Sequence, residues 1–161
     1  MKKMIFAAFA ALLTVGCSDY TKDEKETITD TFPQEMEYTL SREDTINAMA
    51  MAFAKQESQF NHTAVSPCGQ FVGCLQLSEI MVREANRIVG FDIFNYDDRY
   101  DRQGSYAIFK IVQEHYNKNL EIDRAIDIWN KYCPHEYKNN VKKYFTYNLL
   151  NYNNIENYFE L

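Results

Sequence analysis

A helical repeat of apolar residues just after Ser41 constrains the fold more than any other feature of this chain. The repeat follows positions i, i+3, i+4, i+7 and i+8 of one helix face, which are occupied by Ile46, Met49, Ala50, Phe53 and Ala54. Ser41 precedes it as an N-cap, and Glu43 and Asp44 stand in the first turn, where the helix dipole favours acidic residues. The next position on the apolar face is 57, so the pattern predicts that Glu57 lies on the buried side of the helix.

Four further segments of the chain show helical periodicity. We expect helices over about 78–89 (closed by Gly90), 103–116, 122–129 (ending near Pro134) and 137–145. Alternating apolar and polar runs and hairpin turn pairs are missing from the sequence, so we expect a mainly α fold with strands minor or absent. The tail NLLNYNNIENYFEL either packs as a last helix or frays.

The size and charge of the chain limit its function classes. A length of 161 residues with 46% apolar residues suits one compact domain with its own hydrophobic core. The net charge of −6 argues against nucleic acid as a partner, because neutralising phosphates requires clustered Lys and Arg.

The N-terminus predicts export and a lipid anchor. Residues 1–16 combine a positive start with an apolar run too short to span a bilayer, followed by small residues before Cys17. This resembles a bacterial lipobox, in which Cys17 is lipidated and attaches the chain to a membrane; a simple cleaved signal peptide is the alternative. Residues 17–40 read as the lipidated cysteine and a flexible acidic tether, and 41–161 as the functional domain.

Three cysteines remain in the mature domain: Cys68, Cys74 and Cys133. An oxidising envelope favours one disulfide among them and leaves one free thiol. A zinc site built from them with His135 is a weaker alternative, because the chain contains no CxxC pair. We therefore expect no metal.

A carboxyl group on an apolar helix face has a specific chemical use. Burial disfavours its charged form and raises its pKa toward the range of a general acid. Cleavage of a glycosidic bond requires such a protonated acid beside the bridging oxygen. The alternative for Glu57 is an ordinary residue at a helix end, turned toward water.

The residues after Glu57 resemble the signature of the soluble lytic transglycosylase family, which is related to goose-type lysozyme. That signature reads roughly E-S-x-F-N-P-x-A-x-S-P-x-G-A-x-G-L-M-Q-L. The positions that match it in order are Glu57, Ser58, Phe60, Asn61, Ala64, Ser66, Pro67, Gly69, Gly73, Leu75 and Gln76. Ile128-Trp129-Asn130 resembles a further family block, A-Y-N, so the resemblance covers about residues 41–145.

The resemblance implies a lysozyme-like helical domain with a glycan-binding cleft. Glu57 would protonate the β-1,4 oxygen between N-acetylmuramic acid and N-acetylglucosamine. The same carboxylate would then take the proton from the muramoyl 6-hydroxyl, which attacks C1 and closes a 1,6-anhydro ring. This chemistry needs no cofactor and no second catalytic carboxylate. A two-carboxylate hydrolase would need an acid from the following loop, which contains Asp92, Asp97, Asp98 and Asp101.

The resemblance also implies roles for residues around Glu57. Ser66 and Gln76 would bond the sugar or orient Glu57, Asn130 would position the catalytic end of the cleft, and Trp129 would stack on a sugar. The turn from Gly69 to Gly73 would let the backbone approach the glycan. Alternatively, the polar residues are loop caps or satisfied buried amides.

The chain departs from the family pattern at several places. The Gly69–Gly73 loop is one residue longer, Cys74 replaces a leucine, and Ser78 stands where an apolar residue often lines the cleft. Trp129 replaces a tyrosine and loses a hydroxyl that could bond Glu57, and Lys131-Tyr132-Cys133 replaces the glycines after the third block.

We therefore expect a lipoprotein of the cell envelope, in the outer membrane facing the periplasm, that cleaves peptidoglycan glycan strands. A muramidase, in which water replaces the 6-hydroxyl, is the first alternative. A non-catalytic peptidoglycan-binding protein that serves a secretion or conjugation apparatus is the second.

Overall fold

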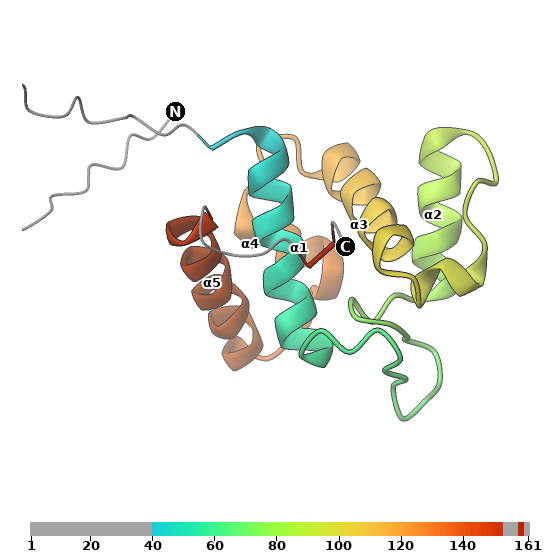
Figure 1. Cartoon of the computed structure of the whole chain (residues 1–161), viewed down its shortest axis with the longest axis horizontal. Coiled ribbons are helices and arrows are strands. Elements are labelled where there is room, and N and C mark those ends of the chain that lie inside the picture. The colour runs from blue at the N-terminus through green and yellow to red at the C-terminus, as the bar shows by residue number, and fades with distance from the viewer. Residues whose placement is uncertain (1–39, 153–157, 160–161) are drawn as a thin grey trace, which may run out of the picture. The chain divides into compact units, whose positions relative to one another are not determined.

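The computed structural model describes residues 40–152 and 158–159 (Figure 1). Its elements are α1 (Arg42–Ser58), α2 (Glu79–Val89), the short 3-10 helix η1 (Tyr96–Arg99), α3 (Arg102–Tyr116), α4 (Ile122–Asn130) and α5 (His135–Leu150). The expected signal peptide 1–16, Cys17 and almost all of the tether lie outside the described residues. Within the described part, none of the helices has the length and apolar character needed to cross a membrane.

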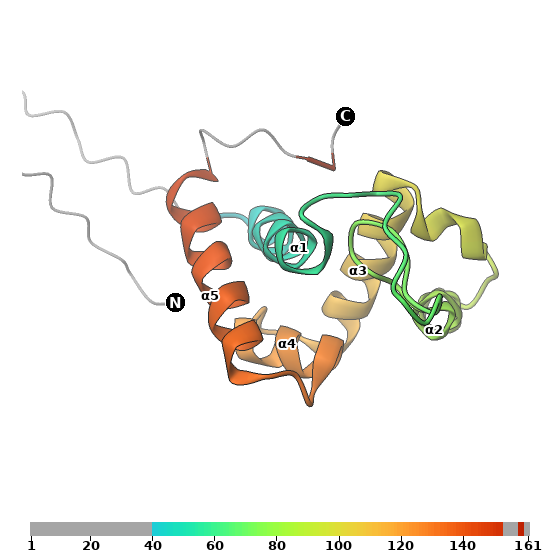
Figure 2. The same cartoon turned by 90° about the horizontal axis from the view of Figure 1, so that it is seen from below.

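Helix α1 is the centre of the fold. Ser41 caps it as predicted, accepting a hydrogen bond from the Asp44 backbone while Asp44 bonds back to Ser41. Every residue from 46 to 54 is buried, so the helix is covered on all sides rather than along one stripe. In Figure 2, α1 is seen nearly end-on between α5 and α3, with α4 below them.

Helices α1 and α5 pack side by side and run in opposite directions. Near the start of α1, the buried Asn148 amide donates to the Ala48 carbonyl at 3.0 Å. At the other end of α1, Tyr137 in the first turn of α5 reaches Glu57. The antiparallel arrangement therefore brings the start of α5 to the end of α1.

An aromatic cluster joins α1 to α3 and α4. Phe53, Phe109 and Trp129 pack with ring centroids 5.0 to 5.5 Å apart. Large aromatic side chains bury extensive apolar surface, and tilted pairs add favourable contacts beyond that burial. This cluster fixes α4 beneath the last turns of α1.

Helix α2 forms as the sequence predicts and packs with η1 on α3. Ser78 is its N-cap, and Gly90 ends it in a left-handed conformation. The role of Ser78 is thus to start a helix, which explains a polar residue where the family pattern has an apolar one. On α3, His115 is exposed.

The loop between α1 and α2 is irregular but well connected. Val72 forms isolated β-bridges with Val65 and Leu77, and these short pairings are the only strand-like contacts in the described residues. The prediction of a mainly α chain with minor strands is confirmed.

The last two described residues of the chain, Tyr158 and Phe159, fold back onto the helices. Tyr158 donates from its hydroxyl to the Phe60 carbonyl at 2.6 Å. Phe159 is buried and stacks on Tyr106 of α3 with a centroid distance of 5.0 Å. These two residues lie in a turn. Of the tail NLLNYNNIENYFEL, residues 148–150 form the end of α5, and residues 153–157 lie outside the described part, so the expected choice between a last helix and fraying stays open.

The expected disulfide is not present. The cysteines in the described part of the chain, Cys68, Cys74 and Cys133, are all free thiols. Cys74 is buried with its sulfur 3.4 Å from the Ser105 hydroxyl, whereas Cys68 is exposed in the loop. The three thiols thus lie in exposed, buried and half-buried environments.

Candidate active site around Glu57

Glu57 lies in the last turn of α1, half-buried as the periodicity predicted. Tyr137 donates a hydrogen bond from its hydroxyl to Glu57 Oε1 at 2.5 Å. Because α5 begins next to the end of α1, this contact joins residues 80 positions apart in the sequence. The carboxyl group therefore faces a protein donor and not only solvent.

Trp129 is the second partner of Glu57. Its side chain hydrogen-bonds the Glu57 carboxyl group, while its ring packs against Phe53 and Phe109. Indole N–H is a donor only, so it favours the ionised carboxylate. Trp129 is thus brought to the site as a half-buried part of the aromatic cluster and as a hydrogen-bond partner of Glu57, and its stacking on a sugar stays a prediction.

The pKa of Glu57 is raised above its ordinary value. Burial is the dominant cause because it removes solvation from the charged form, and the hydrogen bonds from Tyr137 and Trp129 act in the opposite direction. The pKa of Tyr137 is raised by burial and by the neighbouring Glu57 charge, so its hydroxyl stays protonated and remains a donor. The arrangement favours a neutral acid while supporting the carboxylate once it forms.

Ser58 connects α1 to the following loop. Its hydroxyl donates to the Cys74 carbonyl at 2.8 Å. Gln59 and Phe60 then adopt left-handed backbone conformations, with φ of 54° and 66°, which turn the chain sharply away from the helix. The matched motif residues after Glu57 thus set the path of the loop.

Ser66 and Gln76 both brace this loop. The Ser66 hydroxyl accepts from the Phe71 backbone at 3.1 Å. Gln76 donates from its amide to the Gly73 carbonyl at 2.9 Å and to the Ala64 carbonyl at 3.4 Å. These bonds correspond to the loop-capping alternative, and a direct contact of either residue with sugar stays a prediction.

The two glycines of the loop have different functions. A Cβ on Gly73 would lie 1.8 Å from the Arg99 carbonyl oxygen, so this glycine permits close packing of the loop on η1. Gly69 has φ of 71° and open space around it. The close backbone approach expected of this turn is therefore to protein at Gly73, and Gly69 alone leaves space for a ligand.

Asn130 is exposed at the end of α4, and its backbone carbonyl accepts from Cys133 in the turn to α5. The acids of the loop before α3 are partly engaged: Asp98 accepts from Asn95, and Asp101 caps α3 through the Gly104 backbone. These carboxylates stabilise helix starts. No group of three His, Cys, Asp or Glu side chains within the described ranges is placed to hold a metal ion.

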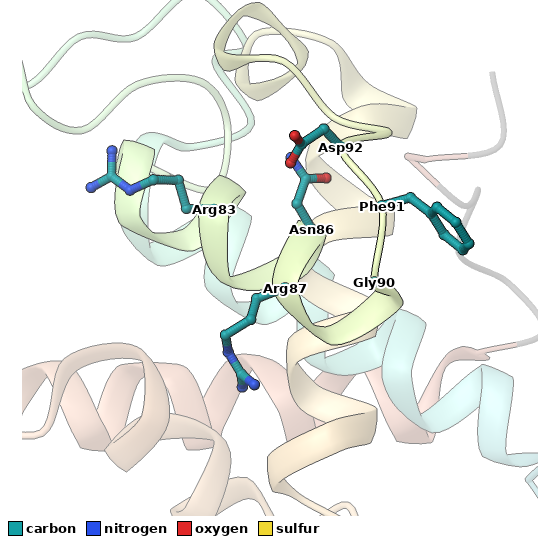
Figure 3. A pocket seen from close by; sticks show the side chains of 6 residues that line it. All are labelled: Arg83, Asn86, Arg87, Gly90, Phe91 and Asp92. Atoms are coloured by element: carbon teal, nitrogen blue, oxygen red, sulfur yellow. The ribbon is translucent and has the colours of Figure 1, made fainter.

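A shallow hollow of about 390 Å³ lies at the C-terminal end of α2 (Figure 3). Its lining residues are Arg83, Asn86, Arg87, Gly90, Phe91 and Asp92. Arg87 is paired with Glu84 at 2.7 Å, and Arg83 bonds the Tyr96 hydroxyl at 3.1 Å. The hollow therefore belongs to α2 and the turn that follows it, whereas the contacts of Glu57 come from α4 and α5.

Sequence reasoning missed Tyr137 as a partner of Glu57. The sequence pattern gave Tyr137 only as the start of the helix expected over 137–145. Nothing local marks it, because its role depends on how α5 packs against α1. The lost hydroxyl of the A-Y-N block was a hint that another donor would be needed, without indicating where it would come from.

Comparison of the chain with protein-family models, with curated proteins and with solved structures finds no match.

Proposed function

We propose that this chain is a peptidoglycan lytic transglycosylase with a lysozyme-like helical domain. The observation that carries the proposal is Glu57: a half-buried carboxyl group of raised pKa with a phenolic and an indole donor. It is also the first residue of the loop motif that resembles the family. A carboxyl group in this setting suits a reaction that needs first a neutral acid and then a carboxylate.

The contacts of Glu57 suggest how each half of the reaction is supported. Its neutral form, favoured by burial, gives its proton to the β-1,4 oxygen as the bond to C1 breaks. The carboxylate that results is stabilised by the hydrogen bonds from Tyr137 and Trp129. It then accepts the proton of the muramoyl 6-hydroxyl as that oxygen bonds C1, which returns Glu57 to its starting state.

The capping roles of Asp98 and Asp101 remove two of the four candidate second acids of a two-carboxylate hydrolase and leave Asp92 and Asp97 as candidates. A two-carboxylate hydrolase needs a second acid at a defined separation from the first. Asp98 and Asp101 are held as caps of η1 and α3. A reaction whose nucleophile is a hydroxyl of the substrate requires no such partner.

The expected location follows from the N-terminal sequence. A lipid on Cys17 would hold the domain at the outer membrane, facing the periplasm, where glycan strands are within reach of the tether. The acidic net charge of −6 suits an enzyme held near its substrate by an anchor rather than by attraction to anionic wall polymers. Service to a secretion or conjugation apparatus is consistent with this placement.

The decisive experiment is mass spectrometry of the muropeptides released from purified peptidoglycan. The wild-type chain should release products with 1,6-anhydro ends, and Glu57→Gln should reduce release to background. Glu136→Gln, which removes an exposed carboxylate in the first turn of α5, should leave release unchanged. Products with reducing ends would instead identify a muramidase. If wild type and Glu57→Gln both release negligible product but both still bind peptidoglycan, the proposal that this chain is an enzyme is refuted.

A further inference from the structure

Trp129, the aromatic platform that the sequence suggested, is half-buried and packs against the core of the domain. The indole contacts Phe53 at 5.5 Å and Phe109 at 5.0 Å between ring centroids, and it also bonds Glu57. Part of the Trp129 side chain is therefore taken up by protein contacts. A more exposed aromatic residue near Glu57 is a second candidate for stacking on the glycan.

The turn between α4 and α5 is tied to Glu57 from both sides. Trp129, at the end of α4, and Tyr137, at the start of α5, both hydrogen-bond the carboxyl group. The turn itself is closed by a hydrogen bond from the Cys133 backbone to the Asn130 carbonyl at 3.1 Å. Its residues are consequently held in a fixed place beside the proposed catalytic acid.

Tyr132 occupies this turn with 90% of its surface exposed. A chain extends at most about 3.6 Å per residue, so the Tyr132 Cα lies within about 11 Å of the Trp129 Cα. Lys131 places its ammonium group 5.8 Å from the Tyr132 ring centroid, which favours an ordered ring through a cation–π contact. The face of this exposed ring is available to a ligand beside the proposed acid, and a tyrosine combines an apolar ring with a polar hydroxyl suited to such a contact.

We propose that Tyr132 is a substrate-binding residue whose ring stacks on the apolar face of a sugar of the glycan strand next to Glu57. Pyranose rings present C–H groups on one face, and these match the electron-rich face of a phenol ring. The inference rests on the proposed function for the identity of the glycan. It assigns binding to Tyr132 and leaves proton transfer with Glu57.

Two other exposed aromatic residues, Phe91 and Tyr147, lack this placement. Phe91 is exposed beyond the end of α2, and Tyr147 is exposed near the end of α5, on the turns that pack beside the start of α1. Tyr147 is therefore a matched control for Tyr132: the same residue type, exposed, on a neighbouring element but at the opposite end of α1.

The test combines kinetics with binding. Tyr132→Ala should raise the KM for peptidoglycan glycan strands about tenfold, equivalent to about 1.4 kcal/mol, with kcat within about twofold of wild type. Tyr132→Trp and Tyr132→Phe should restore the KM because they keep a ring. Tyr147→Ala should have the KM and kcat of wild type. In a Glu57→Gln background, cosedimentation with peptidoglycan should weaken about tenfold on Tyr132→Ala and not on Tyr147→Ala.

The outcomes separate this inference from the proposed function. Normal turnover with an unchanged KM in Tyr132→Ala overturns the stacking role but does not affect the proposal that the chain is a lytic transglycosylase. If wild type shows no turnover but its binding to peptidoglycan depends on the Tyr132 ring, the proposed enzymatic activity is refuted and the stacking role is supported. Because Tyr132 is exposed, all variants should share the wild-type Tm, and a lower Tm in Tyr132→Ala with equal loss of kcat would overturn the inference in favour of a structural role.

Discussion

At the scale of single residues, the state of Glu57 is set by three opposing influences. Burial raises its pKa, and donors on Tyr137 and Trp129 lower it. The net direction is upward, so the acid is neutral over a wider pH range than an exposed glutamate. Removing one donor should therefore raise the pKa further and weaken support for the carboxylate.

Tyr137→Phe removes one hydroxyl and makes this test directly. The proposed first step needs protonated Glu57, so kcat/KM should fall as pH rises through the pKa of Glu57. In Tyr137→Phe this alkaline limb should move to higher pH. The plateau should also fall by about tenfold to a hundredfold, because a hydrogen bond to a charged group contributes about 1.5–3 kcal/mol.

The control for this pH profile is Tyr147→Phe, which changes the same group on the exposed far part of α5. Its profile should coincide with that of wild type. An alkaline limb that stays in place or moves to lower pH in Tyr137→Phe would show that the phenol does not tune the Glu57 carboxyl group.

At the scale of elements, local signals predicted the helices well. Ser41 and Asp44 form the capping box of α1, and Ser78 and Gly90 mark the two ends of α2, each through bonds within a few residues. The partner of Glu57 could not be predicted in the same way. Tyr137 is 80 residues away, and no local pattern indicates that α5 packs antiparallel to α1.

In the loop after Glu57, the role that the motif suggested for the glycines differs from the contacts that they make in the structure. The resemblance gave the glycines a role toward the glycan, but Gly73 packs on the backbone of Arg99. The φ of 78° at Gly73 disfavours a side chain and the contact with Arg99 excludes one, whereas Gly69 has only the unfavourable φ of 71°. Glycine is therefore required at position 73 by backbone conformation and by space, and at position 69 by backbone conformation alone.

Paired substitutions should separate these requirements. Gly73→Ala should lower the free energy of unfolding by about 2–4 kcal/mol, from left-handed strain plus a clash with a backbone oxygen. Gly69→Ala should cost about 1–2 kcal/mol from the backbone conformation alone. Urea unfolding of both variants measures the difference. Equal losses would mean that the contact between the loop and η1 contributes little to stability.

At the scale of the whole domain, the chain's last described residues return to the site region. Tyr158 bonds the carbonyl of Phe60, three residues after Glu57, and Arg102 lies over the Tyr158 ring at 4.5 Å. The Asn/Tyr-rich composition of the tail left its structure open, because it has no helical repeat strong enough to predict burial. Only the packed helices create the surface that Phe159 covers.

The tail should therefore contribute to stability out of proportion to its length. Phe159→Ala should lower the free energy of unfolding by about 3 kcal/mol, because truncating a buried phenylalanine leaves a cavity against Tyr106. Tyr158→Phe should cost about 1 kcal/mol by removing the bond to the Phe60 carbonyl. Leu150→Ala, at an exposed position of α5, should change stability by less than about 0.5 kcal/mol. If urea unfolding finds Phe159→Ala no worse than Leu150→Ala, the tail is not part of the cooperative domain, and the turn after Glu57 must be held by the helices alone.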